Sequence, residues 1–336
     1  MSKMTDSWDN PAYEAALAYQ KTAALMAAIK LDIFTLIGAG ATTSVLLSEK
    51  TRTSSRGMRI LCDFLTVIGL LNKDGRIYSV THTGRRYLDR SSPACLGSSI
   101  DFFAAPELLR LVLDDPVSYV KSGGSDGLGY LAPSHPIWIR FAKAMMPIAS
   151  VTAKRTAAYF ASQSELPSTV LDVAAGHGLY GIELAKMLPR AFFTAVDWPD
   201  VLALAHENAK NAGVSDRFHM VGGSAFEVDW GHNFDLVLLA NFLHHFGRDE
   251  CIAILRKVRL SLSTKGQACV IDFVPNDDRV SPPMQAMFAF WMLATTPKGD
   301  AYTLDDLNNI AKDAGFSGAR GRLLRPTPEM LVLLEI

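Results

Sequence analysis

The chain has 336 residues, enough for two domains, and 49% of them are hydrophobic, so a sizeable core is available. Its formal net charge of −1 and its pI of about 6.7 argue against a protein that as a whole binds nucleic acid or a membrane surface. The polar start lacks the apolar stretch of a signal peptide, and no apolar run reaches the roughly 18 residues that a membrane span needs. Four scattered cysteines without metal-type spacing predict reduced, mostly buried thiols in a cytoplasmic protein: Cys62, Cys95, Cys251 and Cys269.

Residues 1–10 are expected to form a loose tail, and the apolar pattern that follows is helical from Pro11 to about Ile37. This pattern is rich in alanine and places apolar residues on more than one face of the helix. Such a helix buries against something besides its own domain. A partner subunit is the simplest candidate, which favours a homodimer.

Residues 42–88 have a pattern that is typical of a winged helix. It predicts a short helix over 44–50, a second helix over 54–68 with Ser54 as its N-cap, and a hairpin with its turn at 73–75. The region is locally basic, and a winged helix can bind DNA or serve as an interaction module. The second helix lacks the polar set that reads base edges, which favours the interaction module.

Residues 91–155 contain loop signals between helical pieces, and the segment 134–160 predicts a helix that enters the next domain. An aromatic and methionine stripe runs along this helix. Such a stripe usually belongs to a core, yet its position between two domains also allows it to wall a substrate pocket. The stripe consists of Trp138, Phe141, Met145 and Met146.

From about residue 165 onward, apolar strand-like runs alternate with helical patterns, which predicts an α/β fold with a doubly wound parallel sheet. The expected strands are 169–173, 191–197, 218–221, 234–239, 268–273, 321–324 and 330–334. The expected helices are one through Ile182–Met187 and four over 201–212, 249–262, 284–294 and 303–314, with a turn at 263–267.

The stretch 169–197 reads as a strand, a small-residue turn, a helix and a second strand that ends in an acid. Glycines in such a turn let a ligand approach the backbone, and an acid about 20 residues further on can bind a ribose diol. Asp197 stands at the carboxyl end of its strand, where ligands bind in open α/β sheets. Asp172 lies inside the end of the first strand, which fits an S-adenosylmethionine site better than a dinucleotide site. Tight packing of a helix on a strand is the alternative explanation.

Polar residues that could carry chemistry follow the strand 234–239. Asn241, His244 and His245 lie beyond its carboxyl end. Asp272 lies in the next strand, and an acid beside a histidine holds one imidazole nitrogen protonated and leaves the other free as a base. A metal site is the rival interpretation, but no HxH, HxxxH or paired-cysteine spacing supports it.

Six motifs occur together in this chain: LDVAAGHG, VDWPDV, GGSAFEVD, LHHFGRDEC, VIDFVP and MLATTPKGDAYT…AGF. With them the chain resembles the dimeric, S-adenosylmethionine-dependent small-molecule O-methyltransferases, which include plant caffeate and flavonoid enzymes, acetylserotonin methyltransferases and bacterial antibiotic-tailoring enzymes. The resemblance covers nearly the whole chain. It implies a helical and winged-helix dimerisation domain over 1–105, a helical linker over 106–160 that contributes to the acceptor pocket, and a Rossmann-like class I methyltransferase domain over 161–336. It also implies a homodimer acting on a small-molecule acceptor, with neither nucleic acid nor membrane as a partner.

The resemblance implies where S-adenosylmethionine and its product S-adenosylhomocysteine would bind. The turn through Gly176 and Gly178 would pass under the methionine part. Asp197 would bind the ribose hydroxyls, Trp198 would lie beside the adenine, and Asn241 would lie near the sulfonium. The rest of the implied cofactor site is Asp172, Ala174 and, on the adenine side, Ser224, Ala225 and Phe226.

For the chemistry, the resemblance places His244 at the general base and Asp272 at the acid that orients it, with His245 as the fallback base and no metal. The base would take the proton of an aromatic or enolic hydroxyl during in-line methyl transfer. Methyl transfer to carbon or nitrogen, chemistry without methyl transfer, and a DNA-binding regulator are the alternatives. The acceptor pocket would be walled by Trp138, Phe141, Met145, Met146, His245, Phe288, Trp291 and Met292.

Some positions depart from the family pattern. Ala174 and Ala175 replace the usual first glycines, which is tolerable if the backbone there keeps φ negative. Ser224 replaces an acid that pairs with the adenine amino group. A second acid beside the base falls on Ala301, and the neighbouring Asp300 is the candidate to take its place.

Overall fold

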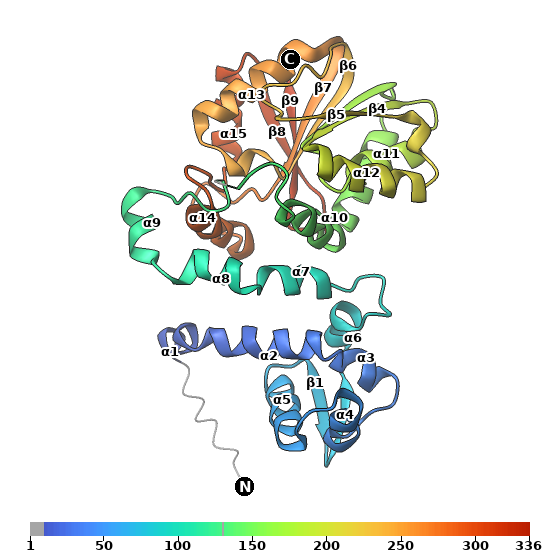
Figure 1. Ribbon diagram of the computed structural model, residues 1–336. Helices are drawn as coiled ribbons and strands as arrows, with labels where there is room; N and C mark the ends of the chain where they lie inside the picture. Colours follow the sequence, from blue (N-terminus) through green and yellow to red (C-terminus); the bar gives the residue numbers. More distant parts are fainter. Residues whose placement is uncertain (1–9, 130) are drawn as a thin grey trace. The chain divides into compact units, whose positions relative to one another are not determined.

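The computed structural model describes residues 10–129 and 131–336 and divides the chain into two compact units (Figure 1). The first unit ends at Leu108 and the second begins at Leu109, inside the helix α8 (Pro106–Leu113). The tail expected over 1–10 lies outside the described residues except for Asn10, whose side chain caps the first helix. The separate linker expected over 106–160 stays a prediction.

The first unit opens with three short helices where the pattern predicted one helical stretch. The last break has a local cause, because Asp32 adopts the left-handed conformation with a φ of 55°. This break lets the helices on both sides contribute to one core, around the buried Ala28 and Phe34. The helices are α1 (Pro11–Ala16), α2 (Ala18–Lys30) and α3 (Ile33–Gly38).

A winged helix follows, as predicted. Ser54 caps the second helix, because its hydroxyl accepts the N–H of Gly57 at 3.3 Å. The hairpin turn consists of Gly75 and Arg76 and so lies later than the predicted 73–75. Gly75 supplies the positive φ, 56°, that this tight turn requires. The elements are α4 (Ser44–Thr51), α5 (Ser55–Val67), β1 (Leu71–Asp74), β2 (Ile77–Val80), α6 (His82–Leu88) and α7 (Gly97–Phe103).

The carboxylate of Asp63 pairs with two basic side chains of the winged helix. Asp63, on α5, accepts a hydrogen bond from Lys73 at 2.5 Å and one from the Tyr78 hydroxyl at 2.7 Å. Arg59, one turn earlier on α5, adds an ion pair at 2.9 Å. The hydrogen bond from Lys73, then that from Tyr78, lowers the pKa of Asp63 to about 2. These contacts tie the hairpin to α5. They also neutralise the positive charges of Lys73 and Arg59, which binding to DNA phosphates would require.

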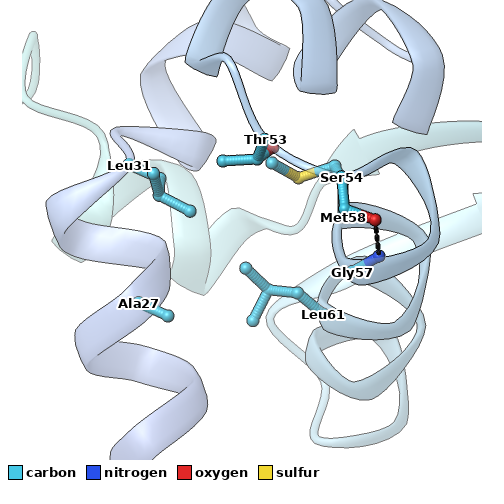
Figure 2. Close-up of a pocket in the computed structure, with 7 residues that line it drawn as sticks. All are labelled: Ala27, Leu31, Thr53, Ser54, Gly57, Met58 and Leu61. Carbon is cyan, nitrogen blue, oxygen red and sulfur yellow. Dashed lines mark hydrogen bonds between the residues drawn. The ribbon is translucent and has the colours of Figure 1, made fainter.

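A hollow of about 270 Å³ lies in the first unit between α2 and α5 (Figure 2). Ala27 lines it from α2 and Leu31 from the position directly after α2, and Met58 and Leu61 line it from α5. Thr53, Ser54 and Gly57 complete the lining. None of these side chains titrates, so the hollow is a gap between packed helices without groups for acid or base chemistry.

The second unit is built on a seven-stranded sheet with the order β5-β4-β3-β6-β7-β9-β8. The first five strands of this order are parallel, and β9 runs antiparallel to both β7 and β8, so the predicted parallel sheet is mixed at one edge. The strands are β3 (Thr169–Val173), β4 (Phe192–Asp197), β5 (Phe218–Gly222), β6 (Phe234–Ala240), β7 (Leu262–Asp272), β8 (Gly318–Leu323) and β9 (Met330–Glu335).

The turn predicted at 263–267 lies inside the strand β7, at an irregularity in its register with β6. Leu262 pairs with Phe234 and Gln267 pairs with Leu236, so the strand absorbs extra residues as an irregularity in register. Residues 263–266 face the single β6 residue Asp235 and have no partner of their own in this register, so the turn signals of Ser263, Lys265 and Gly266 coincide with the irregularity.

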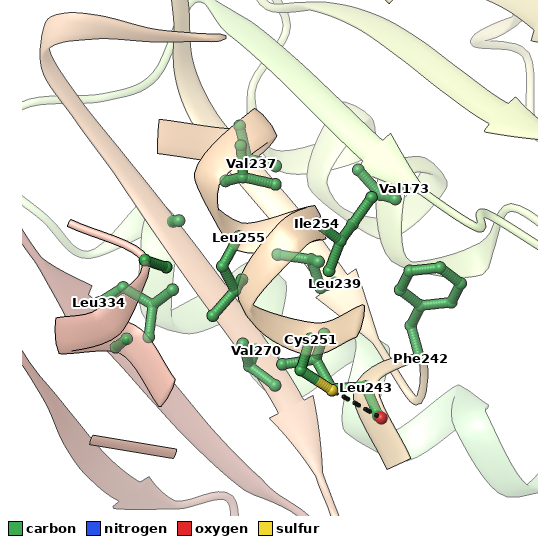
Figure 3. Close-up of a cluster of buried hydrophobic side chains, with 14 of the residues drawn as sticks. Val173, Val237, Leu239, Phe242, Leu243, Cys251, Ile254, Leu255, Val270 and Leu334 are labelled. Atoms are coloured by element: carbon green, nitrogen blue, oxygen red, sulfur yellow. Dashed lines mark hydrogen bonds between the residues drawn. The ribbon is translucent and has the colours of Figure 1, made fainter. Parts of the chain in front are cut away.

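Helices cover both faces of the sheet, which confirms the doubly wound fold (Figure 1). One face packs on α10 (Ile137–Ala161), α11 (Leu179–Met187) and α12 (Pro199–Asn211), and the other on α13 (Arg248–Ser261) and α15 (Leu304–Asp313). Figure 3 shows the second core, where Val173, Val237 and Val270 lie against Ile254 and Leu255 of α13. Shorter elements are α9 (Pro116–Ser122), α14 (Pro283–Thr295), η1 (Ser215–Arg217) and η2 (Leu243–His245).

All four cysteines are free, and three of them are buried, as predicted. Burial raises the pKa of Cys62 and that of Cys251 to about 12, so these thiols are poor nucleophiles. Among the described helices, none is both long enough and apolar enough to cross a membrane.

Candidate active site

The turn between β3 and α11 approaches the left-handed conformation three times. Ala174, Gly176 and Gly178 have φ values of 54°, 57° and 76°. The condition that φ stays negative is therefore not met at Ala174, while Ala175 is absent from the positive-φ residues. The left-handed conformation costs an L-residue roughly 1–2 kcal/mol. Strain of this kind is typical of backbone held in place for a ligand.

Asp197 links the end of β4 to this turn. Its Oδ2 accepts the N–H of Gly176 at 2.8 Å, and its Oδ1 accepts the N–H of Trp198 at 2.7 Å. A carboxylate has about four lone-pair positions, so each oxygen can still accept another hydrogen bond. Burial raises the pKa of Asp197 despite these two backbone bonds. A Cβ on Gly176 would meet only the Ala174 carbonyl, at 3.9 Å, so the backbone here is bare.

Asp172 lies beneath the turn rather than on its surface. Its side chain is buried, and its Oδ2 accepts the N–H of Gly181, in the first turn of α11, at 3.2 Å. Burial raises its pKa to about 7. A Cβ on Gly181 would stand 3.2 Å from that oxygen, so glycine permits the close approach. Asp172 thus supports the turn, and its direct contact with a cofactor stays a prediction.

Asn241 holds an unpartnered polar atom at the end of β6. Its backbone N–H donates to the Ile271 carbonyl at 2.7 Å, and its Nδ2 donates to the Tyr180 hydroxyl at 3.2 Å. Its Oδ1 is buried and has no hydrogen-bond partner in the described part of the chain. A buried acceptor without a partner costs roughly 1–3 kcal/mol, which a bound donor would relieve.

The residues expected on the adenine side form a tight turn after β5. The Ser224 hydroxyl accepts the N–H of Phe226 at 3.3 Å, so this hydrogen bond lies within the turn itself. The Ala225 carbonyl accepts a hydrogen bond from Lys257 at 2.9 Å. The Phe226 ring packs edge-on against Phe246 at 5.0 Å and remains partly exposed. This contact connects the loop to the segment that carries the two histidines.

The helix α10 brings part of its aromatic and methionine stripe toward the expected cofactor edge. Trp138 packs in one cluster with Trp198, and its Nε1 donates to the Ala132 carbonyl at 3.0 Å. The sulfur of Met146 lies 3.8 Å from the side-chain nitrogen of Asn208. The stripe, which includes Phe141 and Met145, is half-buried, and its role as a pocket wall stays a prediction.

The predicted pair of His244 and Asp272 comes together in the structure. His244 lies in η2 after β6, and Asp272 ends the adjacent β7, so parallel pairing brings both to one edge. The His244 Nδ1 lies 2.6 Å from the Asp272 Oδ1, and both side chains are buried. The same oxygen accepts the N–H of Phe273 at 2.8 Å. The carboxylate therefore holds the hydrogen on Nδ1 of His244.

His245 and Phe288 complete the surroundings of this imidazole. The Nε2 of His245 lies 3.1 Å from the Nε2 of His244. Burial, and then the neighbouring His244, hold the pKa of His245 well below its usual range. The Phe288 ring meets His244 edge-on at 4.8 Å and packs on Phe273. Trp291 is half-buried on the same helix α14, whereas Met292 is buried.

Asp300, the candidate for the missing second acid, bonds through its carboxylate to neither imidazole among the described residues. Its carboxylate faces Arg279 at 3.7 Å and accepts the N–H of Ala301 at 2.8 Å. Its backbone N–H donates to the His244 carbonyl at 3.0 Å, so it supports the histidine segment through the backbone. Burial raises the pKa of Asp300. The side chain of Ala301 itself is buried.

Two residues that the sequence did not single out belong to this edge. Tyr180 holds Asn241, and Gly181 meets Asp172. Their signal was their place in the first turn of the helix after a glycine-rich turn. Among the described residues, no three histidine, cysteine or acidic side chains come together in a way that could hold a metal ion.

Comparisons with known proteins match both units. The model of the O-methyltransferase domain matches residues 107–317, and that of the O-methyltransferase dimerisation domain matches 13–90. The tetracenomycin polyketide synthesis 8-O-methyl transferase of Streptomyces glaucescens is 26% identical, over 91% of each chain. The 3-hydroxy-5-methyl-1-naphthoate 3-O-methyltransferase of Streptomyces sahachiroi is 27% identical, over 91% of this chain and 89% of its own.

Solved structures match the whole fold. A provisionally assigned O-methyltransferase from Nostoc punctiforme has a TM-score of 0.92 and 42% identity, over 97% of this chain and 99% of its own. Human N-acetylserotonin methyltransferase in complex with S-adenosylmethionine has a TM-score of 0.83 and 20% identity, over 98% of this chain and 99% of its own. At that identity the human structure supports the fold, which is that of a class I methyltransferase.

Proposed function

This chain belongs to the O-methyltransferase family, and on that premise we propose that it methylates a hydroxyl of a small aromatic or enolic metabolite, with a histidine as general base. The chain is an S-adenosylmethionine-dependent O-methyltransferase of the secondary-metabolite type. The acceptor class, the base and the residues that bind the cofactor are the proposal.

The observation that carries the proposal is the polar edge at the carboxyl ends of β3, β4 and β6. Asp197 would hold the ribose hydroxyls with the lone pairs left on its oxygens, and Gly176 leaves the backbone bare for close approach. Asn241 would offer its unpartnered Oδ1 to a donor of the cofactor. These residues fit S-adenosylmethionine. When bound, this cofactor supplies a methyl group on a positively charged sulfur, so its leaving group needs no further activation.

The chain's own task is then to orient the acceptor and to remove its proton. A phenol resembles a tyrosine side chain, whose pKa is about 10, so it is mostly protonated at neutral pH. A positioned histidine base contributes typically about 10²–10⁴-fold to the rate. His244 has the carboxylate of Asp272 on its Nδ1, which stabilises the imidazolium that forms when a proton arrives.

Aromatic side chains near the imidazole favour an aromatic acceptor. Phe288 meets His244 edge-on, and Phe246, which packs on Phe226, lies edge-on to His245 at 6.3 Å. Ring stacking and edge contacts between aromatic groups add about 0.5–1.5 kcal/mol beyond their buried area. A relative named for a hydroxynaphthoate acceptor supports the same chemical class.

Product analysis tests this proposal. We expect the protein, incubated with S-adenosylmethionine that carries a deuterated methyl group and with 3-hydroxy-5-methyl-1-naphthoate as the probe acceptor, to give an O-methyl ether. A panel of other phenols serves as the second set of acceptors. A labelled methyl group found on carbon or nitrogen would contradict the proposal. So would the absence of any methylated phenol from a protein that binds S-adenosylhomocysteine.

The first unit supports a homodimer. The dimerisation-domain match covers 13–90, which includes the helices that are apolar on more than one face. Sedimentation of the full chain at micromolar concentration is expected to give twice the monomer mass of 36.6 kDa. A monomer across that range would contradict this part of the proposal.

A further inference from the structure

Both ring nitrogens of His244 are occupied by other side chains. Nδ1 bonds to Asp272 at 2.6 Å, and Nε2 lies 3.1 Å from Nε2 of His245. The Phe288 ring stands edge-on against the imidazole at 4.8 Å. The carbonyl of His244 is held by the backbone N–H of Asp300. His244 is thus buried and fixed, with no lone pair open to an acceptor hydroxyl.

The carboxylate of Asp272, which can only accept hydrogen bonds, determines where the hydrogens of the two histidines lie. Because a carboxylate only accepts, Nδ1 of His244 carries hydrogen, and when that imidazole is neutral its Nε2 is a lone pair. His245 must then donate its Nε2–H to that lone pair. Its low pKa keeps it neutral, so its remaining lone pair is on Nδ1. Nδ1 of His245 has no hydrogen-bond partner among residues 10–129 and 131–336.

We propose that the acceptor's proton enters through Nδ1 of His245, with His244 and Asp272 as a relay behind it. This inference rests on the proposed function and changes which histidine touches the acceptor. His245 becomes the catalytic residue, and His244 becomes a positioning residue that acts through it. The order is that of a catalytic triad in which a second imidazole stands where a hydroxyl nucleophile would be.

The proton movements balance. The acceptor's O–H bond breaks and leaves its electron pair on oxygen, while the proton joins Nδ1 of His245. The Nε2 proton of His245 passes to Nε2 of His244, which becomes an imidazolium next to the carboxylate of Asp272. His245 is neutral again, with its hydrogen now on Nδ1. Loss of one proton to water and return of the hydrogen to Nε2 of His245 restore the cluster.

Because no second acid among the described residues bonds to the His244 imidazole, its Nε2 is left for His245 to contact. Ala301 carries no polar group, and the Asp300 carboxylate is turned to Arg279. No described acid other than Asp272 bonds to either imidazole, so His245 is the group that meets Nε2 of His244. His245 as a whole residue is half-buried, whereas His244 is buried.

Nitrogen NMR of the histidine rings tests the inference without an acceptor. In ¹⁵N-histidine-labelled protein with S-adenosylhomocysteine at pH 7, we expect hydrogen on Nδ1 of His244 and on Nε2 of His245, with both rings neutral. His245→Phe identifies the signals, and exposed His206→Phe on α12 is the matched control. Hydrogen on Nδ1 of His245, or on Nε2 of His244, would overturn the proposal. If S-adenosylhomocysteine does not bind, the proposed function fails, and the ligand-free spectrum still decides the tautomers.

Kinetics with the probe 3-hydroxy-5-methyl-1-naphthoate give the second test. His245→Asn is expected to lower kcat at least about 100-fold with little change in KM for S-adenosylmethionine. His244→Asn is expected to have a similar effect, and the double variant should be no worse, because residues that act as a unit are not additive. If His244→Asn is inactive while His245→Asn keeps a kcat within a few-fold of the wild type, the relay is overturned and the proposed function stays intact. If the wild type does not methylate the probe, the NMR result decides.

Discussion

Replacement of Asp172 by asparagine is expected to make the protein less sensitive to high pH. In the folded chain the carboxyl is buried beneath the β3–α11 turn, and its pKa is raised from 3.8 to about 7. Between these values the folded state binds more protons than the unfolded state. Stability is therefore lost as the pH rises through this window, and the loss is complete above about pH 7.

The size of the effect follows from the same two values. At about 1.4 kcal/mol for each pH unit between them, the charged carboxylate costs the folded state at most about 4 kcal/mol above pH 7. The asparagine side chain of the variant would keep an oxygen that can accept the N–H of Gly181, so that hydrogen bond survives. Asp172→Asn should thus gain on the wild type as the pH rises from 4 to 8.

Urea unfolding at a series of pH values between 4 and 8.5 measures this gain. Four of the five tryptophans lie beyond Leu108, so fluorescence reports on the second unit. The exposed Asp216→Asn, in the turn before β5, controls for the loss of one charge. A difference between Asp172→Asn and wild type that stays constant with pH would refute the reasoning, because the buried carboxyl would then ionise as it does in the unfolded chain.

Three further outcomes are expected. Ala174→Gly should stabilise the protein by up to about 1 kcal/mol, because relief of roughly 1–2 kcal/mol of left-handed strain outweighs the greater freedom of unfolded glycine; a clear loss in urea unfolding would contradict this. Asp63→Asn should destabilise the first unit by on the order of 1 kcal/mol at pH 7, and the difference should vanish as the pH falls through about 2; thermal melts with equal stability at pH 7 would count against it. Glu329→Gln should gain stability relative to wild type with rising pH, because burial raises the pKa of that carboxyl, whereas the glutamine can still accept the Thr152 hydroxyl; a gain at low pH instead would reverse the sign.

Much of the second unit was predictable because its strands carry strong local signals. The strand 169–173 coincides with β3, and its continuous apolar run reflects burial on both faces of the sheet. Asp197 falls at the carboxyl end of β4, where the pattern placed it. The turn expected at 263–267 falls on the register irregularity inside β7, where residues 263–266 have no partner on β6.

The sequence predicted which residues form the site better than it predicted how their side chains are arranged. The sequence places His244 and Asp272 on neighbouring strand ends, and parallel pairing then brings their side chains within 2.6 Å. It does not report side-chain rotamers, so it could not reveal that Nε2 of His244 is turned to His245. The positive φ of Ala174 was also hidden, since nothing local requires an alanine to adopt it.

The central claim is that the carboxyl ends of β3, β4 and β6 bind S-adenosylmethionine through Asp197. Isothermal titration calorimetry with S-adenosylhomocysteine tests it most directly, with wild type, Asp197→Ala and the exposed control Asp200→Ala on α12. We expect saturable binding to wild type and to the control, and a loss of at least about 100-fold in affinity for Asp197→Ala, since a carboxylate that bonds two hydroxyls contributes roughly 1.5–3 kcal/mol for each hydrogen bond. No heat from folded wild-type protein, or equal affinity in Asp197→Ala, would contradict the claim.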